Sequence, residues 1–185
     1  MPRLEALRLG HAPALLAFER ENRAYFAASI SDRGDAYFAE FDVRLRELLA
    51  DQAAGLLRFH VVVDDADAVL GRVNLVDVAE GSAELGYRVA ERAAGRGLAT
   101  AAVGKVCALA ATTYGLRTLR AVTTTDNSAS RAVLARTGFL VTGDIDLNGR
   151  PGLRFARDLS AVGDGPAGAG PGQGIGSTAG LIGDW

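Results

Sequence analysis

The sequence predicts one domain of mixed α+β class, on three observations. Its composition is that of a globular protein, with 49% hydrophobic and 23% charged residues in 185. Three consecutive segments alternate apolar and polar residues and are joined by turn-sized linkers, which indicates an antiparallel meander. The chain then continues as helix, strand and helix, an order that implies a parallel strand pair with a crossover connection. We therefore expect an antiparallel sheet onto which one parallel connection is grafted.

The first part of the chain is expected to hold a short strand and two helices. Residues 4–9 alternate loosely and predict a strand. A helix should follow from Pro13 to about Ala28. A second helix is expected over 35–54, where apolar residues recur at spacings of three and four and form one amphipathic stripe.

The meander is predicted over 56–64, 69–78 and 83–91. Each of the first two strands is expected to have an apolar face and a polar face. The polar faces carry Arg58 and His60 on the first strand, and Arg72 and Asn74 on the second.

The remaining elements alternate between helix and strand. We expect a helix over 98–114, a strand over 116–125, a helix over 127–137, and a strand pair over 139–147 and 152–159 around Asn148-Gly149. Gly115 and Gly138 follow the two helices at positions where a left-handed residue ends a helix. Asp126 or Asn127 is the expected N-cap of the second of these helices.

Composition changes after residue 160. Residues 161–185 hold no Lys or Arg and are rich in Gly, Pro and Ala, so they lack the apolar surface that would offset chain entropy. We expect a folded domain over 1–160 and a flexible tail over 161–185.

Charge and cysteine content exclude several classes of function. A net charge of -2 disfavours a general nucleic-acid binder. The sequence has no apolar run of membrane-spanning length, which predicts a cytoplasmic protein without membrane contact. Cys107 is the only cysteine, which excludes an intrachain disulfide and a Cys-based zinc site, and it falls inside an apolar helix where a core role is expected. His11 and His60 are far apart in sequence, so no metal is predicted.

The most informative segment is the loop from Arg92 to Thr100. Gly95 and Gly97 stand immediately before a predicted helix, where the backbone can approach a ligand and free N–H groups point at it with the positive end of the helix dipole. Arg92 and Arg96 add positive charge, as recognition of a pyrophosphate would require. Taken alone, a G-x-G pair is also typical of an ordinary turn.

Three motifs in order resemble the acyl-CoA-binding core of the GNAT N-acetyltransferase superfamily, most closely its Rim-type branch of ribosomal-protein N-terminal acetyltransferases. Arg92-x-x-Gly95-x-Gly97 matches the Q/R-x-x-G-x-G/A loop, and Gly97-Leu98-Ala99-Thr100 matches the G-x-A-T helix start. Asn127-x-x-Ser130 followed by Thr137-Gly138-Phe139 matches the N-x-x-S and x-G-F segment. The resemblance covers residues 84–139 and implies a GNAT fold, with a mostly antiparallel sheet splayed at strands 4 and 5 and flanking helices.

The resemblance implies acetyl-CoA as donor and CoA as product. The strands predicted over 83–91 and 116–125 should splay, so that the pantetheine arm lies between them like an extra strand. The expected CoA-binding residues are Tyr87, Arg88 and Val89 through their backbone, Arg92, Gly95, Arg96, Gly97, Leu98, Ala99 and Thr100 in the loop and helix start, and Asn127, which could contact CoA or cap its helix.

Two residues are candidates for catalysis. Glu84 lies on the central strand near the splay, where the superfamily often places the carboxylate that takes the amine proton; the alternative is a solvent-facing strand residue. Ser130 matches the serine that protonates the leaving thiolate in Rim-type enzymes, against a plain helix-surface serine. Leu134 stands where many members have a tyrosine acid, so no tyrosine acid is carried over.

The resemblance implies an acyltransferase that acetylates a primary amine, with a protein N-terminal amine as the first hypothesis. A small-molecule amine (polyamine, amino acid or antibiotic) and a non-catalytic acyl-CoA-binding module remain alternatives. The expected partners are acetyl-CoA and the amine acceptor. A homodimer is one assembly that the chain could form. A Rossmann dinucleotide site is disfavoured, because the strands before the loop form a meander and Thr100 stands where a third Gly or Ala is required. The helices within 11–54 should border the acceptor and carry no motif, although Tyr25, Tyr37, Phe38 and Phe41 lie there.

Overall fold

The computed structural model describes residues 1–160, and the tail predicted over 161–185 lies outside the described residues. The first half contains β1 (Arg3–Ala6), η1 (Leu9–His11), α1 (Ala12–Glu21), α2 (Arg23–Ala27), α3 (Gly34–Ala39), α4 (Phe41–Ala53), β2 (Arg58–Val63) and β3 (Val69–Ala79). The second half contains β4 (Ser82–Val89), η2 (Glu91–Ala93), α5 (Leu98–Thr112), β5 (Thr118–Thr124), α6 (Ser128–Arg136), β6 (Leu140–Leu147) and β7 (Arg150–Asp158). The predicted α+β order is confirmed.

One sheet runs through the molecule in the order β1-β2-β3-β4-β5-β7-β6. Every neighbouring pair is antiparallel except β4 and β5, which are parallel and are connected by α5. The predicted meander and the parallel crossover are both present. The last hairpin turns at Asn148 and Gly149, whose φ angles of 56° and 81° suit the tight turn that matches strand twist.

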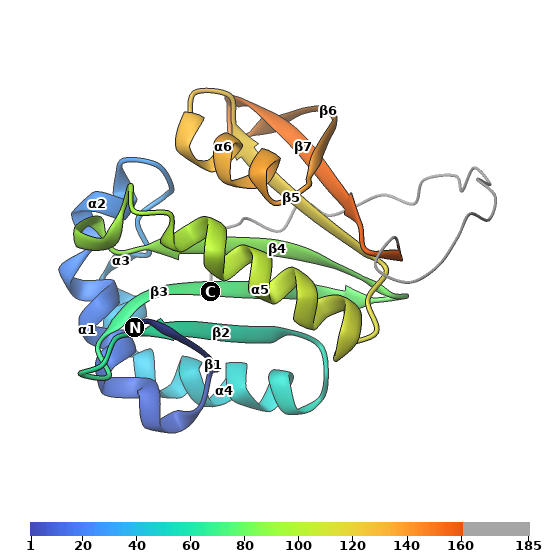
Figure 1. The fold of residues 1–185 in the computed structure, drawn as a ribbon. Coiled ribbons are helices and arrows are strands. Elements are labelled where there is room, and N and C mark those ends of the chain that lie inside the picture. Colours follow the sequence, from blue (N-terminus) through green and yellow to red (C-terminus); the bar gives the residue numbers. More distant parts are fainter. Residues whose placement is uncertain (161–185) are drawn as a thin grey trace.

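The sheet opens between β4 and β5. Their pairing is limited to Ser82–Glu84 against Thr118–Arg120, so beyond Glu84 the β5-facing edge of β4 has no strand partner within residues 1–160. Figure 1 shows the two strands meeting at one end and diverging toward the other, with β5, β7 and β6 leaning away from the rest of the sheet. The expected splay of strands 4 and 5 is therefore present.

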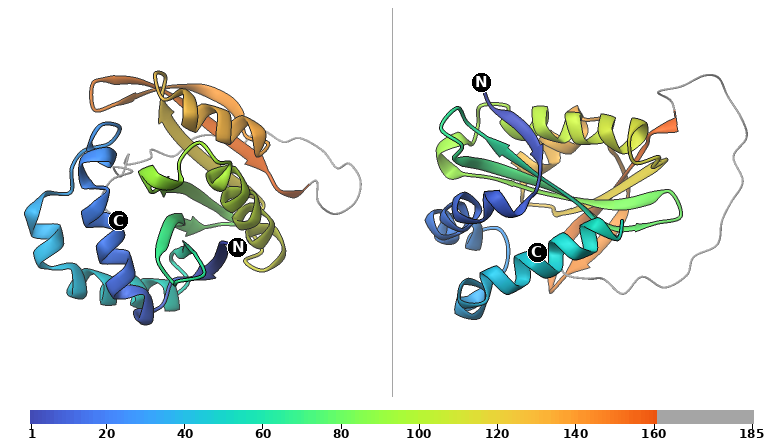
Figure 2. Two further views of the ribbon diagram at one scale, coloured as in Figure 1. Left: turned by 60° about the vertical axis from the view of Figure 1, so that its left-hand side comes forward. Right: turned by 90° about the horizontal axis from the view of Figure 1, so that it is seen from below.

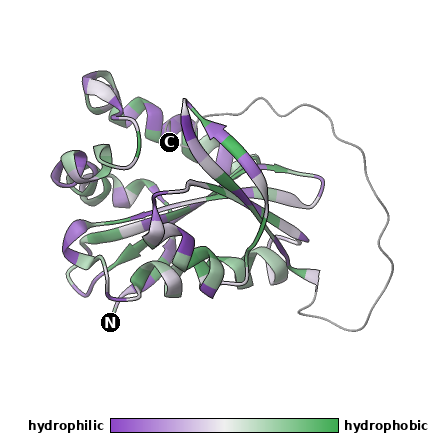
Figure 3. Ribbon diagram, turned by 90° about the horizontal axis from the view of Figure 1, so that it is seen from above, coloured by the Kyte–Doolittle hydropathy of each residue, from purple (hydrophilic) through white to green (hydrophobic). Residues whose placement is uncertain are grey.

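Helices cover both faces of the sheet (Figure 2). On one face α5 and α6 pack through small and apolar side chains, including Val103, Val106 and Leu134, against Leu75 and Leu119. On the other face α1 to α4 form a second core around Phe59, Val61 and Val63. The strands between these layers are mostly hydrophobic (Figure 3), as burial on both faces requires.

The two predicted N-terminal helices are each broken in two, which corrects the sequence interpretation. The first ends at Glu21 because Asn22 turns the chain: its side chain donates to the Phe18 carbonyl at 2.8 Å and accepts from the Glu91 amide at 2.9 Å. The second is interrupted at Glu40, between α3 and α4. The turn at Asn22 brings α2 next to β4, where the Arg88 guanidinium lies 4.9 Å from the centre of the Phe26 ring.

The predicted polar faces of β2 and β3 are not exposed, which is a second correction. His60, only 2% exposed, lies beneath α5, with its ring Nε2 2.7 Å from the Tyr114 hydroxyl and its Nδ1 3.3 Å from the Val73 carbonyl. Arg72 and Asn74, at 4% and 7%, are buried on the opposite face. The alternation of residues correctly predicted which side chains share a face of the sheet. Both faces are buried, however, because helices cover each of them.

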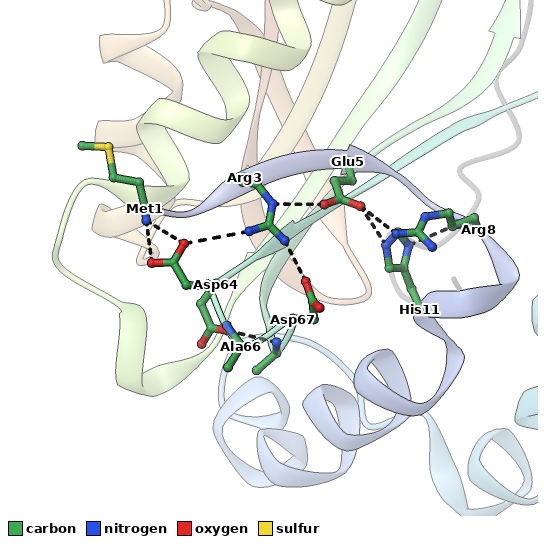
Figure 4. Close-up of polar contacts among 10 residues, drawn as sticks. Met1, Arg3, Glu5, Arg8, His11, Asp64, Ala66 and Asp67 are labelled. Carbon is green, nitrogen blue, oxygen red and sulfur yellow. Dashed lines mark hydrogen bonds and ion pairs between the residues drawn. The ribbon is translucent and has the colours of Figure 1, made fainter.

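Charged contacts hold the N-terminal edge strand β1 (Figure 4). The amino group of Met1 pairs with Asp65 at 2.7 Å, and Arg3 donates to Asp67 at 2.7 Å. Glu5 accepts from Arg8 at 3.1 Å and lies 3.2 Å from His11 Nε2. His11 is thus part of the support of β1, at the sheet edge remote from the opening between β4 and β5.

Candidate active site

A cleft of about 630 Å³ occupies the opening between β4 and β5. Its walls come from β3, β4, the loop before α5, the first turn of α5, α6 and α2. The volume lies within the usual range for a small-molecule or cofactor site. Predicted site residues that line it are Glu84, Tyr87, Arg88, Val89, Gly95, Gly97, Leu98, Ala99, Thr100, Asn127 and Ser130.

The loop end of the cleft is built from backbone. Gly95 and Gly97 have φ angles of 72° and 76°, which lie in the left-handed region that glycine tolerates, and a Cβ on either would meet no atom within 4 Å among the described residues. Conformation, not crowding, therefore requires these glycines, and the space above them is open. Leu98 begins the 15-residue helix α5, whose first N–H groups face this end.

Arg92 and Arg96 extend from the same loop but do not line the cleft. Both are exposed, and the Arg92 guanidinium lies 3.9 Å from Asp64. Their contact with a phosphate stays a prediction. A cationic residue that the sequence analysis missed, Arg136 in the last turn of α6, does line the cleft.

Side chains from β4 and α6 meet across the opening. The Tyr87 hydroxyl lies 2.9 Å from Ser130 Oγ and donates to the Ser130 carbonyl at 3.1 Å. Burial raises the pKa of Tyr87 to about 12, so this phenol keeps its proton at neutral pH. Asn127 accepts from the Ser130 amide at 3.0 Å, which confirms its predicted role as N-cap.

Glu84 lies at the vertex of the opening, opposite Val76 on β3 and Arg120 on β5. It is half-buried and lines the cleft, and its role as the base stays a prediction. Burial, and then repulsion from the nearby Asp77, raise the pKa of Glu84, while Arg120 opposes the rise. A carboxylate with a raised pKa is a stronger base than an ordinary one, as general-base chemistry requires.

The other end of the cleft is bordered by a buried ionic cluster that the sequence analysis did not predict. Glu19 of α1 is 2% exposed, and its carboxylate lies 3.2 Å from Arg72, 3.2 Å from Arg88 and 3.9 Å from Arg33. Burial alone would raise the pKa of Glu19, but the three guanidiniums hold it below its ordinary value. Burial and the neighbouring Arg72 lower the pKa of Arg88 to about 9.

Aromatic residues of the N-terminal helices divide between the cleft and the core. Tyr25 and Phe26 line the cleft, whereas Tyr37 and Phe41 are buried among the helices and Phe38 packs against that core. Cys107 is buried, and burial raises the pKa of its thiol, as expected for a core residue. Residues 1–160 contain no group of three or more His, Cys, Asp or Glu side chains that could hold a metal ion.

Comparison with known proteins assigns the fold to a family. Residues 3–140 match the family model of the acetyltransferase (GNAT) domain. The chain belongs to the GNAT acetyltransferase family. Members of this family are N-acetyltransferases, and the cleft of this chain occupies the opening of the sheet that the family resemblance predicted. No curated protein matches the chain.

Solved structures share the fold at low sequence identity. The ribosomal-protein-S5-alanine acetyltransferase from Vibrio fischeri has a TM-score of 0.82 and 19% identity, covering 86% of this chain and 93% of that one. Mycobacterium smegmatis RimJ in complex with CoA-disulfide has a TM-score of 0.78 and 21% identity, covering 88% and 84%.

A polyamine enzyme is also similar. The spermidine N-acetyltransferase from Vibrio cholerae, in complex with CoA and spermine, has a TM-score of 0.74 and 18% identity, covering 86% of this chain and 96% of that chain. Proteins of similar fold therefore include an enzyme named for a ribosomal protein and an enzyme named for a polyamine. In residues 1–160, no helix is both long enough and apolar enough to cross a membrane.

Proposed function

We propose that this protein transfers the acetyl group of acetyl-CoA to a primary amine, with the N-terminal amine of a protein as the first candidate acceptor. One observation carries the proposal: a single cleft joins the glycine loop before α5 to Glu84 through the opening of the sheet. A thioester held along this opening would place its carbonyl near the vertex, within reach of an amine that enters from the α2 side.

Donor binding is assigned to two backbone segments. The loop around Gly95 and Gly97, together with the first turn of α5, would receive the pyrophosphate through N–H groups. The unpaired edge of β4 at Tyr87–Val89 would bind the pantetheine arm through main-chain hydrogen bonds, as an added strand does. The same edge offers hydrogen-bond donors for the thioester oxygen, which becomes negative when the amine attacks.

The reaction requires two proton transfers. Glu84 accepts a proton from the ammonium group, and the free amine then attacks the thioester carbonyl to give a tetrahedral intermediate. Collapse of this intermediate breaks the C–S bond and releases the CoA thiolate. Ser130, whose Oγ is held by Tyr87, donates its proton to that thiolate and recovers one from the nitrogen, which must lose a second proton to become an amide, so the serine ends unchanged. The products are an N-acetylated amine and CoA.

A polyamine is the second candidate acceptor. Asp77 and Glu84 place two carboxylates on the cleft wall, and carboxylates would attract a polycation. A non-catalytic acyl-CoA-binding module would need neither a base at the vertex nor the hydroxyl pair.

Substitution of Glu84 tests the proposal. Glu84→Gln should lower kcat/KM by about two to four powers of ten at neutral pH, the usual size of general-base catalysis, and should recover partly as pH rises and free amine accumulates. Ser130→Ala should cost less, about one to two powers of ten, because water can replace a weak acid. CoA affinity should be retained in both variants. Release of CoA thiol from acetyl-CoA, with a peptide, an amino acid amide or spermidine as acceptor, measures kcat/KM, and the shift of melting temperature with CoA measures CoA affinity.

Two results would reject parts of the proposal. An unchanged pH–rate profile in Glu84→Gln would remove Glu84 from the mechanism. Tight CoA binding without thiol release on any of the three acceptors would favour the binding module.

A further inference from the structure

Arg72 and Asn74 of β3 both line the cleft. One polar atom of each side chain, Nε of Arg72 and the amide oxygen Oδ1 of Asn74, is buried without a hydrogen-bond partner within residues 1–160. Both residues are more than nine-tenths buried. An unsatisfied buried donor or acceptor costs about 1–3 kcal/mol, so two of them beside a cleft are expected to have a ligand as their partner.

The register of the sheet places these atoms in a row with Glu84. We call the part of the cleft that Glu84 and the Glu19 cluster border its acceptor end. On this face of the sheet Val76 is opposite Glu84, Asn74 is opposite Gly86, and Arg72 is opposite Arg88. Gly86 has no side chain, so no side chain of β4 stands opposite Asn74. Residues two apart on a strand are separated by roughly 7 Å, which leaves room for one small group between Asn74 and its neighbours in the row.

Charge along the row differs from one end to the other. Glu84 and Asp77 supply negative charge at the vertex. At the far end the guanidiniums of Arg72 and Arg88 share one carboxylate, that of Glu19. Arg72 and Arg88 are direct cross-strand neighbours, and the Glu19 carboxylate, 3.2 Å from each, offsets their mutual repulsion. Nε of Arg72 is left as a hydrogen-bond donor without a partner within residues 1–160. An oxygen of the acceptor supplies such a partner, whereas an ammonium group of a polycation does not.

We propose that Asn74 and Arg72 position the acceptor, and that they select an amine whose adjacent carbon bears a carbonyl or carboxylate oxygen. Oδ1 of Asn74 accepts an N–H of the amine while Glu84 removes its proton, and Nε of Arg72 donates to the oxygen. An amino acid and a protein N-terminus share this chemistry, and a polyamine lacks it. This inference rests on the proposed acetyl transfer.

Matched acceptors and variants test it. Alaninamide carries the carbonyl and isopropylamine does not, and comparing each variant with the wild type cancels the different basicities of the two amines. Arg72→Lys keeps a positive charge beside Glu19 but loses Nε. It should lower kcat/KM for alaninamide about tenfold to hundredfold, mainly through KM, and leave isopropylamine within about twofold.

Asn74→Val fits the strand and replaces the buried amide by an apolar group. It should lower kcat/KM for both amines by about fivefold to tenfold without lowering the melting temperature, which a merely structural role would lower. Asn22→Ala is the structural control, because its amide is fully engaged at the α1–α2 corner; it should lower the melting temperature and leave the ratio between the two amines unchanged. Alanine against an alanyl tripeptide amide separates a free amino acid from a protein N-terminus.

The inference is overturned if Arg72→Lys lowers kcat/KM for both amines equally or for neither amine. It is also overturned if Asn74→Val leaves kcat/KM for both amines unchanged. Should the wild type transfer no acetyl group at all, the proposed function fails, and saturation-transfer NMR of the two amines on the CoA complex still decides the inference. Binding of alaninamide that Arg72→Lys weakens supports it, and equal binding of both amines rejects it.

Discussion

The two ends of the cleft are built in opposite ways. The donor end consists of backbone from consecutive residues, with Gly95 and Gly97 in left-handed conformations and open space above them. The acceptor end consists of side chains that come from α1, β3 and β4, and the ion cluster of Glu19 and its arginines there is buried. A site made from one continuous segment needs only local conformation. A site made from distant elements exists only when the whole domain has folded.

Charge follows the same division. Arg92 at the donor end has 54% of its side chain exposed, so solvent screens it. Glu19 and its arginines are buried away from water. An unpaired charge in such a buried position is costly. The acceptor end should therefore be more important for stability, and the donor end for ligand affinity.

Loss of the Glu19 charge should give the largest effect. Glu19→Gln removes the carboxylate that Arg72 and Arg88 share, and the free energy of unfolding should fall by about 3–5 kcal/mol, as for other broken buried ion pairs. Urea unfolding measures the change, and Glu21→Gln on the exposed side of the same helix serves as control. Equal losses in the two variants would show that the cluster does not stabilise the fold.

A change at Gly97 should affect the donor end alone. Saturating CoA should raise the melting temperature of the wild-type protein, since any ligand of the native state does so. Gly97→Glu introduces a side chain at a left-handed position and a negative charge where the pyrophosphate is expected, so CoA affinity should fall at least about a hundredfold, or roughly 2.7 kcal/mol. The thermal shift with CoA should then disappear. A shift that survives in Gly97→Glu would place the pyrophosphate elsewhere.

The donor end could be predicted from sequence because its determinants are local. The two glycines, the helix start at Leu98 and the cap at Asn127 all depend on neighbours within a few residues, and all are present in the structure. The strand order and the splay followed from the same segment through the family resemblance.

The acceptor end could not be predicted in the same way. Arg72 and Asn74 alternate with apolar residues and so indicated a polar face of the strand, but α1 packs over β3 and both residues are buried. Nothing within a few residues of Glu19 in the sequence identifies its arginine partners. The breaks at Asn22 and Glu40 were missed because the apolar stripe continues across them, whereas the turn at Asn22 depends on a contact with Glu91, far along the chain.

The smallest expected effect concerns Glu84 and joins the two properties of the acceptor end, chemistry and stability. Because the pKa of Glu84 is raised in the folded protein, the unfolded chain releases this proton first as pH rises above the ordinary value of 4.5. Folding then places a charged carboxylate in a half-buried position beside Asp77. The wild type should therefore lose stability relative to Glu84→Gln as pH rises through this range, and the difference should level off above the folded pKa.

Urea unfolding of both proteins between pH 4 and pH 8 measures the difference, with the exposed Glu47→Gln on α4 as a control that should show none. Asp77→Asn removes a repulsive neighbour and should reduce the difference. A stability difference that stays constant with pH would mean that Glu84 titrates as an exposed residue. Such a residue would be no better prepared than a surface carboxylate to take a proton from the acceptor amine, because the same burial that destabilises its charged form makes it the stronger base.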